Sequence, residues 1–221
     1  MANKKDSISS SVGLFGDIGI EGIVERSEAI EVPEGDTLAR ILAELKSESH
    51  ICGVCKPGMP VIFGMGPERA DLMLIGEGPG VDDIKTELPF QGQAGALLAK
   101  MMAAINVGLG ECYVCNVIKC IPPGERNFSV EEIEDCRPYL LRQILAVRPR
   151  VIVAFGALAA QTLLRSRKTI SELRGEVYTL RLNDHEMKIV PTFNPAYLLR
   201  VPEKKREAWE DLKRVREMRE V

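Results

Sequence analysis

DLMLIGEGPG, residues 71–80, places a short apolar run with strand character directly before a glycine-rich turn. Three later apolar runs have the same character, and helical stretches separate the runs. The runs are YVCNVIK (113–119), RVIVAFG (150–156) and KIVPTF (188–193), and the helical stretches include 94–106, 130–147 and 157–165. Strands that alternate with helices form parallel sheets covered on both faces, so the sequence predicts an α/β fold. We expect a three-layer α/β/α sandwich around a central four-stranded parallel sheet.

The ends of these predicted strands indicate where a ligand would bind. In open parallel sheets, ligands sit beyond the carboxyl ends of the strands. Here those ends carry GEGPG (76–80), the segment 116–120, Phe155–Gly156 and FNPAYLL (193–199). Three of the four have an unusual composition, which predicts a functional site at this edge.

Charge and hydropathy restrict the class of protein only weakly. The formal net charge of −3 and the pI near 5.6 give no global attraction to nucleic acid, so DNA binding would need a local concentration of Lys and Arg. No apolar run reaches the about eighteen residues of a membrane helix, and the start lacks the apolar core of a secretory signal. We therefore expect a cytoplasmic protein with no membrane segment.

The chain divides into a short extension and one domain. Residues 1–36 are rich in Ser, Gly, Asp and Glu without sustained periodicity, so we expect a weakly ordered N-terminal extension. The domain covers 37–221 and begins with a helix whose apolar residues recur at helical spacing, with Asp36 or Thr37 as its cap. From Pro202 the tail has the pattern of a charged, amphipathic helix.

Six cysteines are many for a chain in which thiols stay reduced, so metal or redox chemistry is the use to test. Cys52 and Cys55 form a C-x2-C pair, and Cys120 and Cys136 could complete a four-thiolate site. This spacing does not distinguish zinc from iron–sulfur. Cys112 and Cys115 also form C-x2-C, but residues three apart in a strand point to opposite faces. We expect these two to be small apolar strand residues.

Five motifs in order resemble those of the family 4, thermostable-type uracil-DNA glycosylases. They are GEGPG with LPFQGQAGALL, then NVIKCIPPGERN, EIEDCRPYLLRQI and PTFNPAYLLR, and the resemblance runs from about Cys52 to Trp209. It implies an enzyme that flips uracil out of DNA, single- or double-stranded, and hydrolyses its N-glycosidic bond, leaving an abasic site. It also implies a [4Fe–4S] cluster, held by Cys52, Cys55, Cys120 and Cys136. We further expect a monomer.

The resemblance assigns roles at the carboxyl ends of the strands. Phe90 would stack on the flipped base; the alternative is an ordinary phenylalanine of the core. The carboxamide of Asn116 would form hydrogen bonds with the edge of the base; the alternative is a buried amide that bonds only main-chain groups. Main-chain N–H groups of the Glu77–Gly78 turn could stabilise charge on the departing uracil. A carboxylate from Glu77 or Asp83 would orient water or stabilise the sugar cation.

Two positions depart from the family's pattern. Asn194 stands where the family has His, so its amide can donate to uracil O2 but cannot become cationic. Asp83 stands where the family often has the longer Glu. Both changes leave the rate and the range of bases open.

DNA contacts are expected from two segments. One is the proline-rich loop, and the other follows Asn194, where an apolar side chain could wedge into the gap left by the flipped base. The residues are Pro122, Pro123, Gly124, Arg126 and Asn127 in the first segment, and Pro195, Ala196, Tyr197, Leu198 and Leu199 in the second. Positive charge at 204–206 lies nearby in sequence.

Two other functions fit parts of the pattern. The same scaffold could serve a weakly active or non-catalytic iron–sulfur protein that binds DNA, with Asn194 as the cause of the lost chemistry. A nucleotide-binding α/β protein could use GEGPG as a phosphate cradle, but no Lys-Ser/Thr follows these glycines and no acidic residue completes a dinucleotide fingerprint.

Overall fold

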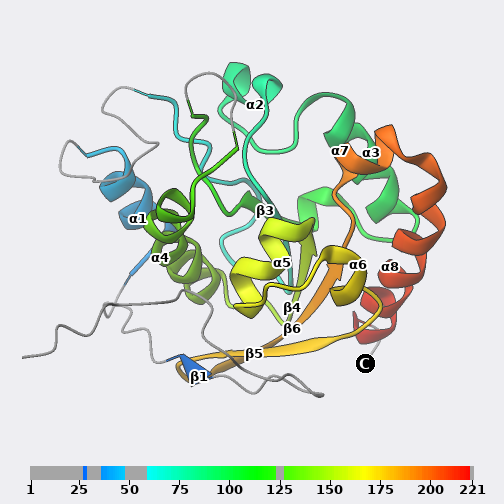
Figure 1. Cartoon of the computed structure of the whole chain (residues 1–221). Coiled ribbons are helices and arrows are strands. Elements are labelled where there is room, and N and C mark those ends of the chain that lie inside the picture. The colour runs from blue at the N-terminus through cyan, green and yellow to red at the C-terminus, as the bar shows by residue number, and fades with distance from the viewer. Residues whose placement is uncertain (1–26, 29–35, 48–58, 123–126, 220–221) are drawn as a thin grey trace, which may run out of the picture.

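A computed structural model describes residues 27–28, 36–47, 59–122 and 127–219, and a single mixed sheet forms its centre (Figure 1). The described strands lie in the order β1-β5-β6-β4-β2-β3. They are β1 (Ser27–Glu28), β2 (Leu72–Gly76), β3 (Cys112–Asn116), β4 (Val151–Phe155), β5 (Tyr178–Leu182) and β6 (His185–Thr192). Strands β6, β4, β2 and β3 are mutually parallel, which confirms the predicted four-stranded core.

The sheet is wider than predicted on one side. Strand β5 pairs antiparallel with β6, and the short β1 pairs parallel with β5. The β5–β6 turn contains Asn183 with a φ of 50°, a left-handed conformation that Asn tolerates better than most residues. The alternating pattern of YTLRL (178–182), followed by an Asn-Asp pair, was the available signal for this hairpin.

Helices cover both faces of the sheet, as predicted for a three-layer sandwich. Helices α4 and α5 pack on one face, and α3 and α8 pack on the other. The helices are α1 (Leu38–Leu45), α2 (Val81–Thr86), α3 (Gly92–Ala103), α4 (Val130–Val147), α5 (Ala157–Leu164), α6 (Ile170–Leu173), α7 (Pro195–Arg200) and α8 (Lys205–Arg219). Two 3₁₀ turns are η1 (Leu109–Glu111) and η2 (Pro202–Lys204).

Alternate residues of each central strand enter opposite layers of the core. In β2, Leu72 and Leu74 face α3 and α8, whereas Met73 and Ile75 face α4 and α5. The same alternation puts Cys112 in one layer and Cys115 in the other, with both thiols free and both side chains buried. The expectation that these two cysteines are apolar strand residues unable to chelate together is confirmed.

Local signals set the helix starts. Helix α4 has the predicted bounds, and it begins after Ser129, whose hydroxyl accepts from the Glu132 N–H while the Glu132 carboxylate accepts from the Ser129 N–H. Helix α1 begins after Thr37, whose hydroxyl accepts from Arg40 N–H at 3.2 Å. Asp36 instead forms an ion pair with Arg142 of α4 at 2.7 Å, which ties α1 to the domain.

Most of the predicted N-terminal extension lies outside the described residues, and so do Cys52 and Cys55. Only β1 and Asp36 are described from residues 1–36. In the described ranges, no helix is both long and apolar enough to cross a membrane.

Candidate functional site

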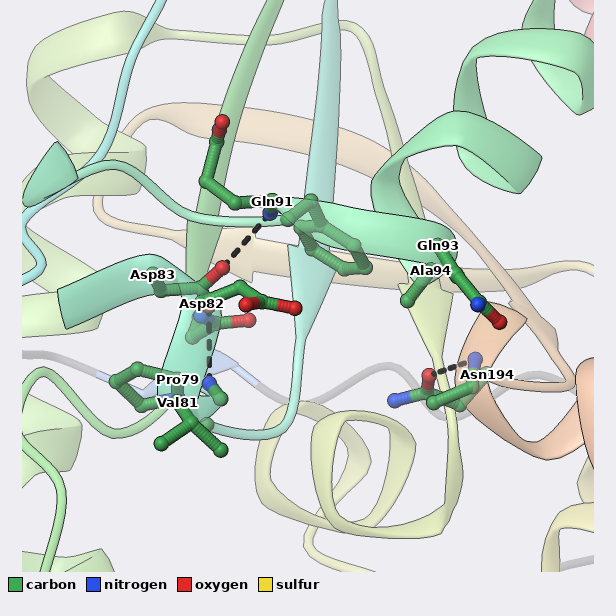
Figure 2. A pocket seen from close by; sticks show the side chains of 13 residues that line it. Pro79, Val81, Asp82, Asp83, Gln91, Gln93, Ala94 and Asn194 are labelled. Atoms are coloured by element: carbon green, nitrogen blue, oxygen red, sulfur yellow. Dashed lines mark hydrogen bonds between the residues drawn. The ribbon is translucent and has the colours of Figure 1, made fainter. Parts of the chain in front are cut away.

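A cavity of about 460 Å³ opens at the carboxyl ends of β2, β3 and β6, where the sequence places its unusual motifs. Figure 2 shows Pro79, Val81 and Asp82 on one side of it, with Gln93, Ala94 and Asn194 on the other. The lining residues are Gly78, Pro79, Gly80, Val81, Asp82, Asp83, Phe90, Gln91, Gln93, Ala94, Asn116, Asn194 and Ala196. Seven of these residues had no predicted role. Residues 79, 80, 91, 93 and 94 belong to the motifs GEGPG and LPFQGQAGALL, and residues 81 and 82 directly follow the first motif, so their place in the sequence was the available signal.

Phe90 and Asn116 converge over the end of β2. A Cβ atom built on Gly76 would lie 2.3 Å from Asn116 Oδ1 and 2.5 Å from the ring of Phe90, so only glycine allows both to approach. Phe90 has a φ of 56°, an uncommon conformation for an aromatic residue, and its ring meets that of Phe155 edge to face at 6.2 Å. Backbone strain of this kind often accompanies a functional site.

The carboxamide of Asn116 is buried and incompletely bonded. Its side chain is 2% exposed, and among the described residues its Nδ2 has no hydrogen-bond partner. An unsatisfied buried amide costs about 1–3 kcal/mol, so native proteins seldom keep one without a reason. Since this amide lines the cavity, a ligand with an acceptor at that point would satisfy it.

Glu77 and Asn194 come from different strand ends and contact each other directly. Glu77 Oε2 accepts from Asn194 Nδ2 at 3.1 Å, and Oε1 accepts from Leu158 N–H at 3.0 Å, in the first turn of α5. Asn194 Oδ1 accepts from Ala196 N–H at 2.9 Å and thereby caps α7. A Cβ on Gly156 would overlap the Glu77 carboxylate, so this glycine leaves room for it.

Asp83 supports the loop beside the cavity. Its side chain is 5% exposed; Oδ2 accepts from Gly80 N–H at 3.0 Å, and Oδ1 from Gln91 N–H at 2.7 Å (Figure 2). These bonds join the start of α2 to the segment that follows Phe90. They give the carboxylate a structural task that sequence reasoning did not foresee.

Cys120 and Cys136 both lie deep in the protein. Both are 0% exposed, and Phe128 packs against the clusters that contain each of them. Cys120 is disulfide-bonded in the structure. Within the described ranges, no three His, Cys, Asp or Glu residues form a group that could hold a metal ion.

The two predicted DNA-contacting segments are only partly described. In the first, Pro122 is buried and Asn127 is exposed, while Pro123, Gly124 and Arg126 lie outside the described residues. In the second, Leu198 is 1% exposed and packs with Phe193 and Ala208, so it belongs to the core.

Two other residues of the second segment differ in exposure. Tyr197 stacks on Phe193 with ring centroids 5.3 Å apart, whereas Leu199 is 39% exposed. Leu199 therefore remains the most accessible of the proposed wedges. The positive charge of Lys204 is engaged by Glu207 at 2.6 Å.

Fold and cavity together define a three-layer α/β protein with a site at its carboxyl edge suited to a planar ring that offers hydrogen bonds. The sequence profile of the uracil DNA glycosylase superfamily matches residues 63–213. A type-4 uracil-DNA glycosylase of Archaeoglobus fulgidus is 37% identical over 83% of this chain and 94% of its own length. Type-4 enzymes of Thermotoga maritima and Pyrobaculum aerophilum are 35% and 33% identical over 75% and 77% of this chain, and 85% and 89% of their own lengths. The chain therefore belongs to the uracil DNA glycosylase superfamily and, within it, to the type-4 group.

Proposed function

We propose that this protein is a DNA repair glycosylase that hydrolyses the N-glycosidic bond of uracil in DNA and leaves an abasic site. The observation that supports it most directly is the buried Nδ2 of Asn116, which has no hydrogen-bond partner in the described ranges and lies beside the ring of Phe90 in the cavity. A pyrimidine that enters there gains a stacking surface and a hydrogen-bond partner in one step. The names of the type-4 relatives support the same substrate.

Recognition of the base follows from the chemistry of a carboxamide. Asn116 can donate through Nδ2 to uracil O4 and accept at Oδ1 from uracil N3–H. Cytosine presents the opposite pattern, an amino group and a bare ring nitrogen, so both contacts would fail. The Phe90 ring would contribute stacking worth about 1–3 kcal/mol for any base. Stacking therefore provides affinity, and Asn116 provides selectivity.

Bond cleavage needs stabilisation of charge on two fragments. Negative charge grows on the leaving uracil, and positive charge grows on the sugar. One hydrogen of Asn194 Nδ2 is used by Glu77, so the second can donate to uracil O2 from a side chain that two other bonds already orient. Main-chain N–H groups of the turn that contains Gly78 would assist at O2.

Glu77 is the better placed of the two candidate carboxylates for the sugar cation and the attacking water. Its Oε2 contacts Asn194 while Oε1 accepts from Leu158 N–H, whereas both oxygens of Asp83 accept main-chain N–H groups of the loop beside the cavity. We infer that Asp83 acts on catalysis through the loop that it supports. Because Asn194 stays neutral, its help to the leaving group comes from a dipole and not from a full charge.

For the cofactor we propose a [4Fe–4S] cluster bound by Cys52, Cys55, Cys120 and Cys136. The two described cysteines fit this role, since both side chains are buried and come from separate segments of the chain. Thiolates, not disulfides, bind iron, so assembly requires reducing conditions. A bound cluster would act as a crosslink that holds the segment following Asn116 against α4.

The proline-rich loop and the segment after Asn194 would contact the DNA, with Leu199 as the wedge. A monomeric state, a cytoplasmic location and activity on both single- and double-stranded DNA remain predictions.

The test of the reaction uses oligonucleotides that differ in one base. We expect the protein to produce alkali-labile abasic sites in strands that contain uracil, and none in matched strands with cytosine or thymine. Absence of abasic product from every uracil strand, single or paired, would overturn the proposal and favour a non-catalytic protein that binds DNA.

The test of the cofactor uses buried cysteines as matched variants. Cys120→Ala and Cys136→Ala should lose the iron and the brown absorbance of the reduced, reconstituted protein, whereas Cys112→Ala should keep both. Iron retained equally by all three variants would contradict the assignment.

A further inference from the structure

Lys119 is buried completely inside the domain, at the segment that joins Asn116 to Cys120. It is 0% exposed and is among the largest fully buried side chains of the described residues. Lysine is almost never fully buried unless it is paired. In the described part of the chain its amine has no carboxylate partner; Nζ donates to the main-chain oxygen of Asn116 at 2.6 Å and to Gln143 Oε1.

Gln143 is oriented so that its oxygen faces this amine. It is also 0% exposed, and its Nε2 donates to Phe63 O at 3.0 Å and to the Tyr113 hydroxyl at 3.1 Å. Both amide hydrogens are therefore used, and Oε1 is left to accept from Lys119. Gln143 belongs to α4, so a continuous set of hydrogen bonds connects that helix to the main chain of Asn116.

Main-chain bonds hold the rest of this segment from the side of β2. Val117 N–H donates to Gly76 O at 2.9 Å, and Ile118 N–H donates to Glu77 O at 3.1 Å. The Asn116 carbonyl lies at the end of β3, where regular pairing stops, and Lys119 is the group that engages it. Because Asn116 Nδ2 has no hydrogen-bond partner among the described residues, the direction of that carboxamide depends on the main chain behind it.

We propose that Lys119 is a positioning residue for base recognition: with Gln143, it holds the main chain of Asn116 so that the carboxamide faces the base. This inference rests on the proposed function. Burial lowers the pKa of Lys119, while Cys115 and Cys136 oppose that change. An amine donates hydrogen bonds whether or not it is charged, so the role does not depend on its protonation state.

The test is a double-mutant cycle between Lys119 and Asn116, read as the single-turnover rate of uracil excision. Lys119→Met keeps the length of the side chain and removes the donor. We expect this change to lower the rate on the order of 10- to 100-fold, as small misplacements of reacting groups do. In an Asn116→Ala background, the same change should lower the rate less than about twofold, because the group that it positions is gone.

A general loss of packing would give a different result. It would lower the rate by the same factor in both backgrounds, and that outcome overturns the proposal. Leu182→Ala removes a buried side chain beside His185, at the amino end of β6 and away from the cavity. It should lower thermal stability and leave the rate below its unfolding temperature unchanged.

A second variant keeps the proposal testable if Lys119→Met does not fold. Gln143→Met removes the acceptor that orients the amine and should lower the rate by a smaller factor, again only when Asn116 is present. A wild-type rate for Gln143→Met would overturn the proposal. If the wild-type protein excises no uracil, the proposed function and this inference both fail. If the wild-type protein is active and Lys119→Met is equally active, only this inference fails.

Discussion

Two buried polar groups at the carboxyl edge of the sheet, Asp211 and Asn116, differ in how their hydrogen bonds are completed. At the end of β6, Thr192 donates to Asp211 at 2.7 Å, and Arg174 bonds both oxygens of that carboxylate at 2.8 and 3.0 Å. At the end of β3, Asn116 Nδ2 has no partner among the described residues. Where the protein supplies every partner, the group stabilises the fold; where one is missing, we infer that the ligand supplies it.

The network at β6 also bears on the site. Arg174 donates to Glu207 O at 2.6 Å, and its guanidinium lies 5.5 Å from the centre of the Phe193 ring. Phe193 directly precedes Asn194. The network therefore fixes the strand end that carries the amide proposed to face the leaving group.

The largest expected effect on stability comes from breaking the hydrogen-bond network around Asp211. Arg174→Met should lower the free energy of unfolding by about 3–5 kcal/mol at neutral pH, because it leaves the Asp211 carboxylate buried and uncompensated. Burial raises the pKa of Asp211, and an acid with a raised pKa in the folded state loses stability as the pH rises through that value. The penalty should therefore shrink in acid, which denaturant titrations at several pH values would show.

Arg181→Met is the matched control, since Arg181 pairs with Glu186 on the surface, where both side chains are nearly half exposed. It should leave the free energy of unfolding nearly unchanged at any pH, because water solvates both partners. Equal costs for the two arginines would mean that burial of the partner does not matter.

Removal of the Asn116 carboxamide, whose hydrogen bonds are incomplete, should lower activity strongly and stability only slightly. Asn116→Ala should reduce uracil excision by about 10²–10³-fold, the scale for losing one transition-state donor, while the stability changes by less than about 1 kcal/mol. Asn183→Gly, which removes a carboxamide from the β5–β6 turn, should leave excision unchanged. A large loss of stability in Asn116→Ala would show that this amide has a structural partner after all.

Two glycine variants test how closely Asn116 and Phe90 approach each other over the end of β2. Gly76→Ala should lower excision by about tenfold or more, because the new methyl group would overlap Asn116 Oδ1 and the Phe90 ring. Gly110→Ala meets no atom within 4 Å and should leave excision unchanged. Equal activity of the two variants would exclude the close approach of Asn116 and Phe90 over β2.

The smallest effect is expected at Asp83, which borders the cavity although both of its carboxylate oxygens already accept hydrogen bonds from the protein. Asp83→Asn keeps the shape and one acceptor of the side chain, so we expect a stability loss of about 1 kcal/mol and an excision rate changed by no more than about threefold. Thermal melts and rate measurements on the same preparation would decide. A loss comparable with that of Asn116→Ala would assign Asp83 to the chemistry.

Much of this site could be predicted because its residues lie in short segments next to strand ends. GEGPG, LPFQG and the Asn116–Cys120 segment each have a local signature, and the parallel sheet brings their ends to one edge. The contacts between Glu77 and Asn194 and between Lys119 and Gln143 had no such signal. Their members lie 117 and 24 residues apart, and each side chain taken alone resembles an ordinary polar residue.

The sequence by itself determined the period of the strands, the bounds of α4 and the opposite faces of Cys112 and Cys115. These follow from local geometry, since the direction of a side chain along a strand depends only on its neighbours in the chain. The tertiary structure alone decided which buried polar groups have all their hydrogen-bond partners within the protein. Burial removes water from every donor and acceptor at once, so the partner of a group depends on which distant segments pack around it. That is why Asp211 and Asn116, both polar and both buried, have different roles.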